Sequence, residues 1–259
     1  LLVLLLTINI IIMASTSETG HAKNVANFEK LVAETTAFGT TYNPAKAALK
    51  TAALSTQLTA AKAAITAVNS AEPAYKNAVS ARDAAFVPFG KLITRINNAL
   101  KASDTTVQVD ESAMTLVRKL QGRRATAKKT DEEKKAAAAE GKEVVEISSS
   151  QMSYDSRLDN FDKLIKLLTS VTAYAPNEAD LKVTALTTLY NDLKAKNTAV
   201  MTAETPLSTA RIARNDVLYK PNTGIVDTSV DVKSYVKSVY GATSPQYKLI
   251  SSLKFTNYN

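Results

Sequence analysis

Cysteine is absent from this chain of 259 residues, and histidine occurs once, as His21. Without cysteine the protein has no disulfides, no thiolate metal sites and no cysteine nucleophile. A single histidine excludes in practice a di-iron site of paired Glu-x-x-His motifs, and it excludes histidine-dependent acid–base or triad chemistry. We therefore expect no metal, no cofactor and no catalytic residue, and we expect His21 to be a surface or internally satisfied residue.

Glycine and proline are also scarce, with seven of each. An all-β protein needs more turn residues than this for its hairpins, so the composition favours helices. The glycines are isolated from one another, whereas a phosphate-binding loop needs closely spaced glycines that let backbone N–H groups approach the phosphates. The expected fold class is therefore all-α, without a nucleotide-binding loop.

Charge of one sign is not concentrated in any segment. The net charge is +8, made up of +4 before Arg123, +1 from Arg123 to Ser150 and +3 after it. A nucleic-acid surface concentrates positive charge. The diffuse excess here argues against a nucleic-acid partner and is explained by solubility alone.

The only long apolar run is Leu1–Ile12. Twelve helical residues span about 18 Å, which is too short for a bilayer core of about 30 Å. Two interpretations remain open: a signal-peptide remnant cleaved near Ala14, or sequence upstream of a true start at Met13. We favour the start at Met13 and a cytoplasmic protein, whereas a signal remnant would make the protein secreted or periplasmic. In either case residues 1–20 are a lead ahead of the folded part.

An internal repeat is the strongest pattern in the sequence. Asn27–Leu31 (NFEKL) returns 133 positions later as Asn160–Leu164 (NFDKL). Tyr42–Arg82 then aligns without a gap with Tyr174–Arg214, at an offset of 132. Eighteen of these 41 pairs are identical, and seven of the eighteen are Ala–Ala pairs that composition alone would supply. We predict two tandem copies of one helical-bundle unit.

Residues 21–122 form the first predicted bundle and residues 151–259 the second, each made of consecutive helices. In the first copy one helix stops at Gly39, and Asn43 caps the next, with Pro44 in its first turn. A heptad-like apolar seam follows and recurs in the second copy with one polar substitution. The seam positions are Leu54, Leu58, Ala61, Ile65 and Val68, matched by Leu186, Tyr190, Leu193, Asn197 and Val200.

The later helices of each copy follow prolines. Ser70 and Thr202 are expected to cap a new helix, with Pro73 and Pro206 inside its first turns, where each proline marks a helix start or a kink. Further helices are expected over 89–101 and about 230–240. A serine-capped helix is expected to close each copy.

The segment 123–150 between the copies is rich in alanine, lysine and glutamate. Opposite charges four residues apart, such as Asp131 and Lys135, support a solvated helix. No apolar stripe is present until Val144. We expect an exposed helical or mobile linker, which would be the protease-sensitive point of the chain.

Two charged residues recur in both copies: Glu72 and Arg82 in the first, Glu204 and Arg214 in the second. Glu72 and Arg82 are ten residues apart, about 15 Å along one helix, so they cannot pair with each other. We expect them to have a structural role, partly buried against other helices.

Six basic residues cluster where the first copy meets the linker, and they are the candidate contact for an anion such as phosphate or an acidic lipid. No aromatic residue lies among them to stack on a base, and acidic residues follow at once and cancel the field. A solvated linker is therefore favoured over an anion site. The six residues are Arg118, Lys119, Arg123, Arg124, Lys128 and Lys129.

Three stretches of the chain resemble uncharacterised helical proteins of Bacteroidetes bacteria: GHAKNVANFEKL, QMSYDSRLDNFDKLI and YVKSVYGATSPQYKLISSLKF. The resemblance extends from Met13 to Asn259. It favours Met13 as the start of the chain. It implies no particular activity, because that group brings none with it.

The expected function is that of a non-enzymatic helical scaffold or binding protein, which acts through a protein partner or through self-association. The first alternative is a membrane- or surface-associated helical protein, toxin-like or bound to an anionic surface. It would need a long exposed apolar helix, and membrane binding is not favoured because only Leu1–Ile12 approaches one. The second alternative is an unrecognised hydrolase of the Ser–Lys or paired-carboxylate type, which needs a pocket lined by convergent polar groups.

Overall fold

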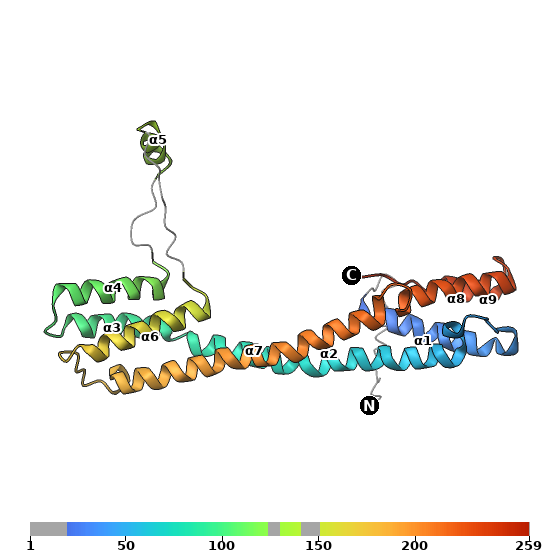
Figure 1. Cartoon of the computed structure of the whole chain (residues 1–259), viewed down its shortest axis with the longest axis horizontal. Helices are drawn as coiled ribbons and strands as arrows, with labels where there is room; N and C mark the ends of the chain where they lie inside the picture. Colours follow the sequence, from blue (N-terminus) through green and yellow to red (C-terminus); the bar gives the residue numbers. More distant parts are fainter. Residues whose placement is uncertain (1–19, 124–129, 141–150, 259) are drawn as a thin grey trace, which may run out of the picture. The chain divides into compact units, whose positions relative to one another are not determined.

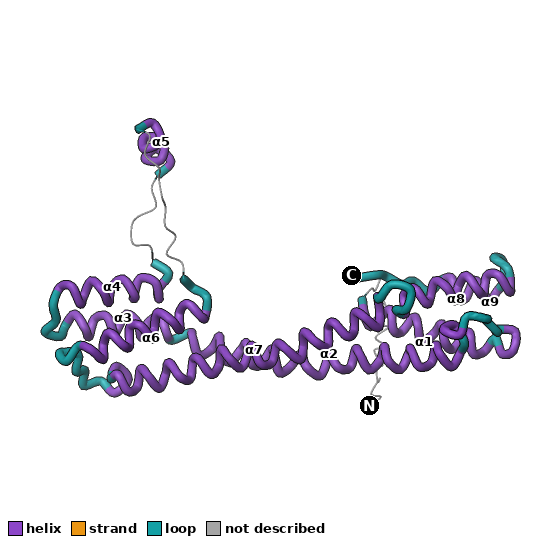
Figure 2. The backbone as a smooth tube through the Cα atoms, in the orientation of Figure 1, coloured by secondary structure: helices purple, strands orange, loops and turns teal. Residues whose placement is uncertain are grey.

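The computed structural model describes residues 20–123, 130–140 and 151–258, and every regular element in these ranges is helical (Figure 1, Figure 2). The predicted all-α fold class is therefore confirmed. Leu1–Ile12, with the possible start at Met13, lies outside the described residues, as do two parts of the predicted linker. Within the described ranges, no helix is long and apolar enough to cross a membrane.

The helices vary widely in length. Short 3₁₀ turns precede the two longest ones: η1 (Gly39–Thr41) and η2 (Ala47–Leu49) ahead of α2, and η3 (Ala179–Leu181) ahead of α7. The α-helices are α1 (His21–Ala37), α2 (Thr51–Phe86), α3 (Phe89–Lys101), α4 (Val107–Gln121), α5 (Asp131–Ala139), α6 (Tyr154–Ser170), α7 (Val183–Tyr219), α8 (Ile225–Tyr240) and α9 (Pro245–Ser251).

The described chain divides into two compact units, and each unit combines parts of both predicted copies. Unit 1 contains residues 20–73 and 206–258, and unit 2 contains residues of the range 74–205. Unit 1 therefore holds α1, the first part of α2, the last part of α7, α8 and α9. Unit 2 holds the last part of α2, α3, α4, α6 and the first part of α7. This division differs from the expected arrangement of one bundle for each copy.

Pro73 and Pro206 lie inside helices, and the prediction that Ser70 and Thr202 cap new helices is wrong. α2 continues through Pro73 for 36 residues, and α7 continues through Pro206 for 37 residues. An internal proline removes one i→i−4 hydrogen bond and crowds the preceding turn. Ending the helix would instead leave about four N–H and four C=O groups without intrahelical partners. Each long helix therefore runs on from one unit into the other.

The core of unit 1 takes eight residues from each predicted copy. The apolar face of α1 packs against α8 and α9, and α8 packs against α9. Burying a side chain of this kind contributes about 1.5–3 kcal/mol, so contacts between the copies hold this unit together. The buried residues are Val25, Phe28, Leu31, Val32, Tyr42, Leu49, Leu54 and Ala61 from the first copy and Leu218, Tyr219, Ile225, Val226, Val232, Val236, Ile250 and Leu253 from the second.

The core of unit 2 is shared between the copies in the same way. α3, α4 and α6 lie side by side in this unit (Figure 1). The rings of Phe89 on α3 and Phe161 on α6 meet edge-on, with centroids 4.9 Å apart. The buried residues are Phe86, Phe89, Ile93, Ile96, Leu100, Ala113, Val117 and Leu120 from the first copy and Leu158, Phe161, Leu164, Ile165, Leu168, Tyr174, Leu181, Leu186 and Leu193 from the second.

The start predicted for the second helix, at Asn43 and Pro44, is wrong because α2 begins at Thr51. The intervening chain forms two 3₁₀ turns instead. Lys46 and Lys50 on either side of η2 have extended backbones, with ψ angles of 113° and 146°, so a single helix cannot run through this segment.

A buried tyrosine fixes the segment ahead of each long helix. The Tyr42 hydroxyl donates a hydrogen bond to the Leu49 carbonyl at 2.8 Å, just before α2. The Tyr174 hydroxyl donates to the Leu181 carbonyl at 2.9 Å, just before α7. Both phenols are buried, and each satisfies a main-chain carbonyl that a helix starting earlier would have used internally.

The other predicted boundaries are met to different degrees. Gly39 follows the end of α1 with a φ of 62°, and α3 covers the expected range. α8 begins at Ile225, about five residues before its predicted start, because its first turn is buried and fixed. There Asp227 accepts a hydrogen bond from the Asn222 N–H at 2.8 Å, and the Ser229 hydroxyl donates to the Ile225 carbonyl.

The two closing helices begin differently. Ser244 caps α9 as predicted, because its side chain accepts a hydrogen bond from the Tyr247 N–H at 3.1 Å. The residue at the start of α4 is Thr106, whose side chain makes no capping hydrogen bond. The predicted serine cap is therefore wrong for α4.

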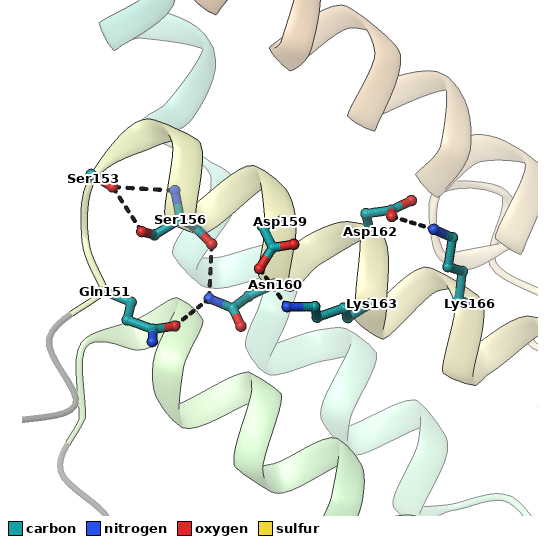
Figure 3. Close-up of polar contacts among 8 residues, drawn as sticks. All are labelled: Gln151, Ser153, Ser156, Asp159, Asn160, Asp162, Lys163 and Lys166. Atoms are coloured by element: carbon teal, nitrogen blue, oxygen red, sulfur yellow. Dashed lines mark hydrogen bonds and ion pairs between the residues drawn. The ribbon is translucent and has the colours of Figure 1, made fainter.

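The first turns of α6 are held by side chains (Figure 3). The Ser153 hydroxyl accepts a hydrogen bond from the Ser156 N–H at 3.2 Å. The Asn160 amide donates to the Ser156 carbonyl and to Gln151 Oε1, both at 2.8 Å, so it fixes the chain ahead of the helix. Two exposed i,i+4 ion pairs follow, Lys163 with Asp159 and Lys166 with Asp162.

α5 lies in the segment predicted to be the linker, and none of its residues is buried. A capping box starts it: the Thr130 hydroxyl accepts from the Glu133 N–H at 3.2 Å, and the Glu133 carboxylate accepts from the Thr130 N–H at 2.8 Å. The three acidic residues of the first turn also favour the positive end of the helix dipole.

Candidate functional site

Arg82 joins the end of α2 to the start of α6 within unit 2. Its guanidinium stacks on the Tyr154 ring, 3.8 Å from the centroid, and its Nη1 donates to Asn197 Oδ1 at 3.4 Å. Asp83 lies 3.6 Å from its Nε and accepts a hydrogen bond from the Tyr154 hydroxyl at 2.7 Å. Only 17% of the Arg82 side chain is exposed, so this repeated arginine lies in a helix interface.

Arg214 occupies the matching position in unit 1. It lies near His21, the first residue of α1, whereas Arg82 lies over Tyr154, the first residue of α6. Its Nε and Nη2 both donate to Asn215 Oδ1, at 3.1 and 2.8 Å. The guanidinium is therefore held by a neighbour on its own helix. Of the repeated glutamates, Glu72 is partly buried on α2 and Glu204 is exposed on α7.

His21 is internally satisfied and takes part in packing. Its Nδ1 lies 2.6 Å from the Tyr219 hydroxyl oxygen, and its ring meets the Tyr258 ring edge-on at 5.3 Å. Burial, followed by the positive charge of Arg214, lowers the pKa of His21 below its ordinary value. The imidazole is therefore neutral at pH 7, and it joins α1 to α7 and to the C-terminal segment.

Two asparagines of α1 fasten the C-terminal segment. The Asn24 side chain exchanges two hydrogen bonds with the main chain of Thr256, at 2.7 and 3.0 Å, and Asn27 donates to the Lys254 carbonyl at 2.7 Å. Asn27 belongs to the repeated NFEKL motif, and its counterpart Asn160 holds the segment ahead of α6. The motif was interpreted only as a sign of the repeat, and the recurrence of its asparagine was the signal of this further role.

The described part of the basic cluster lies at the end of α4. Arg118 is exposed and Lys119 is partly buried in the last turn, and Arg123 follows it as an exposed residue. Cations in a last turn are favourable next to the negative end of the helix dipole, so these positions have a structural reason. Arg124, Lys128 and Lys129 lie outside the described residues.

The densest run of identity between the copies lies on exposed positions of the long helices. Within residues 62–72 and 194–204, Val68 and Val200 are the identical pair that is buried in both copies, at 8% and 5% exposed. The remaining identical pairs are exposed or partly buried in both copies: Lys62 and Lys194, Ala63 and Ala195, Thr66 and Thr198, Ala67 and Ala199, Ala71 and Ala203, and Glu72 and Glu204.

These residues form one small-residue face on each long helix. Alanines at steps of four lie in a row along a helix, with the intervening Lys, Thr or Ser positions beside them. On α7 this row borders an open hollow of about 590 Å³. The α2 face consists of Lys62, Ala63, Thr66, Ala67, Ser70 and Ala71, and the α7 face of Lys194, Ala195, Thr198, Ala199, Thr202 and Ala203.

Unit 2 also contains a polar cleft of about 510 Å³ between α3 and the segment ahead of α7. Arg95 at its edge forms an ion pair with Asp180, with one hydrogen bond of 3.1 Å. The Ser103 hydroxyl donates to the Ala99 carbonyl at 2.9 Å. The lining residues contain no lysine and only one carboxylate, Glu178. The cleft therefore offers neither a Ser–Lys pair nor a pair of carboxylates.

Over the ranges that the structure describes, no group of three or more His, Cys, Asp or Glu side chains is arranged to hold a metal ion. Comparison of the chain with protein-family models, with curated proteins and with solved structures finds no match.

Proposed function

We propose that the protein is a non-enzymatic helical scaffold, formed by duplication, whose α2 face and α7 face each bind an α-helix of a protein partner. The observation that carries this proposal is the identity of exposed residues between the two copies. Packing explains why the two valines recur, and the lysines have contacts of their own, because Lys62 pairs with Glu29 on α1 and Lys194 lies over the Tyr190 ring. Neither packing nor these contacts explain the recurrence of the exposed threonines, Thr66 and Thr198, and of the alanines beside them. A shared binding role accounts for their recurrence at matching positions.

Helix propensity is a weaker explanation of the two faces. Alanine and lysine favour helices, but threonine does not, and it recurs at Thr66 and Thr198 in the same exposed position. Thr66 satisfies its own hydroxyl by donating to the Lys62 carbonyl at 3.0 Å. Its methyl group and the flanking alanines therefore leave a flat, weakly polar surface.

The shape of each face suits a helix rather than a loop or a strand. Alanines four residues apart allow the axis of a second helix to approach to about 8 Å, the short end of the range for packed helices. A lysine lies at the start of each face, and a repeated glutamate, Glu72 or Glu204, follows its end. A partner helix with the opposite order of charges would complement both faces.

The duplication is part of the same proposal. It is supported by the matching Tyr42 and Tyr174 hydrogen bonds and by the matching positions of Arg82 and Arg214. Kinship with helical proteins of Bacteroidetes stays a prediction. A second copy of this chain is one possible source of the partner helix.

Site-specific photo-cross-linking in the native cells tests the proposal. A photoreactive phenylalanine analogue is placed at Ala67, at Ala199, or as a control at Ser80, an exposed α2 residue that is not repeated. We expect Ala67 and Ala199 to cross-link the same protein and Ser80 not to do so. Adding Ala63→Glu to the chain that carries the probe at position 67, or Ala195→Glu to the chain that carries it at position 199, should remove the corresponding cross-link without changing the helical circular dichroism. Cross-linking at neither face above the level of Ser80 would contradict the proposal.

A further inference from the structure

Unit 1 and unit 2 are built alike around the segment that precedes each long helix. η2 packs against α8 in unit 1, and η3 packs against α3 in unit 2. The buried positions of α3 fall on buried positions of α8 when the numbering is shifted by 136. The matched buried pairs are Phe89 and Ile225, Ile93 and Ser229, Ile96 and Val232, and Leu100 and Val236.

An ion pair at a matching place supports this correspondence. Asp231 of α8 pairs with Lys46, ahead of α2. Arg95 of α3 corresponds to Asp231 and pairs with Asp180, ahead of α7. The signs of the charges are exchanged, and Asp180 lies two positions beyond Glu178, the counterpart of Lys46. In both units, however, the pair joins the helix to the segment before the long helix.

Tyr235 fills the space between α8 and this segment in unit 1. Its ring meets the Tyr42 ring edge-on, with centroids 5.3 Å apart and an interplanar angle of 86°. Its hydroxyl oxygen accepts a hydrogen bond from the Asn43 backbone N–H at 3.1 Å. The phenol of Tyr235 therefore satisfies a main-chain donor and closes this side of the unit.

Ala99 stands at the position of Tyr235 in unit 2. It lines the 510 Å³ cleft together with Ala102, and the opposite wall includes Ala175 and Pro176. Ala175 corresponds to Asn43, and among the described residues none accepts a hydrogen bond from the Ala175 N–H. By its helix position and its main-chain N–H, the cleft corresponds to the place that the Tyr235 phenol occupies in unit 1, although Tyr174, the counterpart of Tyr42, is not among its lining residues.

We propose that this cleft binds a phenolic ring, supplied either by a tyrosine side chain of a partner or by a free phenol. The ring lies over Ala99 and Ala102, and its hydroxyl oxygen accepts a hydrogen bond from the Ala175 N–H. Tyr235 in unit 1 shows the arrangement within the same chain. This proposal does not depend on the two small-residue faces.

The size and the lining of the cleft suit this ligand. A cavity of about 150 Å³ is enough for a benzene ring, so a cleft of about 510 Å³ leaves room for the main chain that carries a tyrosine. Alanine, proline and leucine side chains provide an apolar wall, and Asn98 and Asn177 provide polar groups at the rim. Specific sites commonly combine an apolar wall with a few such polar groups.

Titration of the full chain with p-cresol, followed by ¹H–¹⁵N chemical shifts, tests the proposal. We expect saturable shifts at the Ala175 amide and along residues 95–103, with a dissociation constant on the order of 1 mM. Toluene lacks the hydroxyl and should bind at least about fivefold more weakly. Tighter binding of N-acetyltyrosinamide than of p-cresol would point to a partner's tyrosine, and the reverse order to a free phenol.

Three variants provide matched controls. Ala99→Tyr should fill the cleft and abolish the p-cresol shifts, and Ala102→Leu narrows the cleft if the first variant does not fold. Tyr235→Ala should open the corresponding space in unit 1 and create a second p-cresol site that reports on the Asn43 amide. p-Cresol binding in unit 1 of the Tyr235→Ala variant without binding in unit 2 of the unchanged chain would overturn the proposal. Equal binding of toluene and p-cresol would overturn the assigned hydrogen bond.

Discussion

Cutting the chain between Arg123 and Thr130 should leave both parts in one complex. The cut can be introduced by inserting a recognition sequence for a specific protease at this point. The N-terminal fragment then carries α1 to α4, and the C-terminal fragment carries α5 to α9. Because each unit takes helices from both fragments, neither fragment contains a complete core.

The expected affinity follows from the two cores. The two cores contain roughly 30 buried side chains, each contributing about 1.5–3 kcal/mol of apolar burial. Separating the fragments exposes the part of this surface that is not covered within one fragment, as it is between α3 and α4 or between α8 and α9. Ordering the chain and losing translational freedom offset most of this gain. A binding free energy of about 8 kcal/mol corresponds to a micromolar dissociation constant. The free energy of apolar burial in the shared cores, before the costs of ordering are subtracted, is several times larger. We therefore expect a dissociation constant below about 1 μM.

Size-exclusion chromatography with light scattering measures the outcome. The cut protein should elute at the mass of the uncut chain, keep its helical circular dichroism, and acquire a melting temperature that depends on concentration. Uncut protein with the same insertion is the control. Each fragment expressed alone should show no cooperative unfolding. Two fragments that separate at micromolar concentration and each unfold cooperatively would refute the shared cores and restore one bundle for each copy.

Three further perturbations test individual contacts. Arg82→Ala should lower the free energy of unfolding by about 1–3 kcal/mol in urea titrations, because it removes a desolvated ring contact and a hydrogen bond. Arg214→Ala should lower the free energy of unfolding by less. An equal decrease would contradict the different contacts of the two arginines. Because the pKa of His21 is lowered in the folded state, the unfolded chain binds a proton first as the pH falls. The free energy of unfolding should therefore decrease as the pH drops below about 6.5. His21→Gln should reduce this decrease between pH 7.5 and 5.5, and an unchanged pH dependence in the variant would contradict the role of His21. Tyr42→Phe and Tyr174→Phe should each lower the free energy of unfolding by about 1 kcal/mol, because each leaves a buried main-chain carbonyl without its donor. A decrease for only one of the two variants would contradict the equivalence of the two tyrosines.

Helix content and most of the core positions could be predicted from the sequence, because these depend on local properties. The seam residues Leu54, Ala61, Leu186 and Leu193 are fully buried, as the spacing of apolar residues requires. Gly39 has the positive φ expected just beyond the end of a helix. Composition, apolar spacing and helix-end glycines act within one or two turns, so a single sequence displays them.

Boundaries that depend on tertiary contacts could not be predicted in this way. Asn43 and Pro44 have the pattern of a helix start. The Tyr42 hydroxyl, however, donates a hydrogen bond to the Leu49 carbonyl, seven residues later, and this contact holds the segment in 3₁₀ turns ahead of α2. Pro73 and Pro206 have the pattern of a helix start as well. Packing of the long helices on both sides of each proline outweighs the loss of one hydrogen bond.

The candidate sites show the same limit. The sequence singled out Arg82 and Arg214 by their recurrence, but it did not show that each lies beside the first residue of a helix from the other copy. The vacant position of Tyr235 in unit 2 was not visible either. It emerges only when α3 and α8, which have little sequence identity, are matched by their buried positions.

The sequence by itself determined that the chain is helical and where its apolar stripes lie. It left open which stripes share a core, because two predicted copies with the same pattern can pair within a copy or between copies. The tertiary structure decides this through α2 and α7. A continuous helix of 36 residues extends for about 54 Å, so its last turns cannot fold back onto its first turns. The helices that follow α2 therefore pack with the second copy, and those that follow α7 pack with the first.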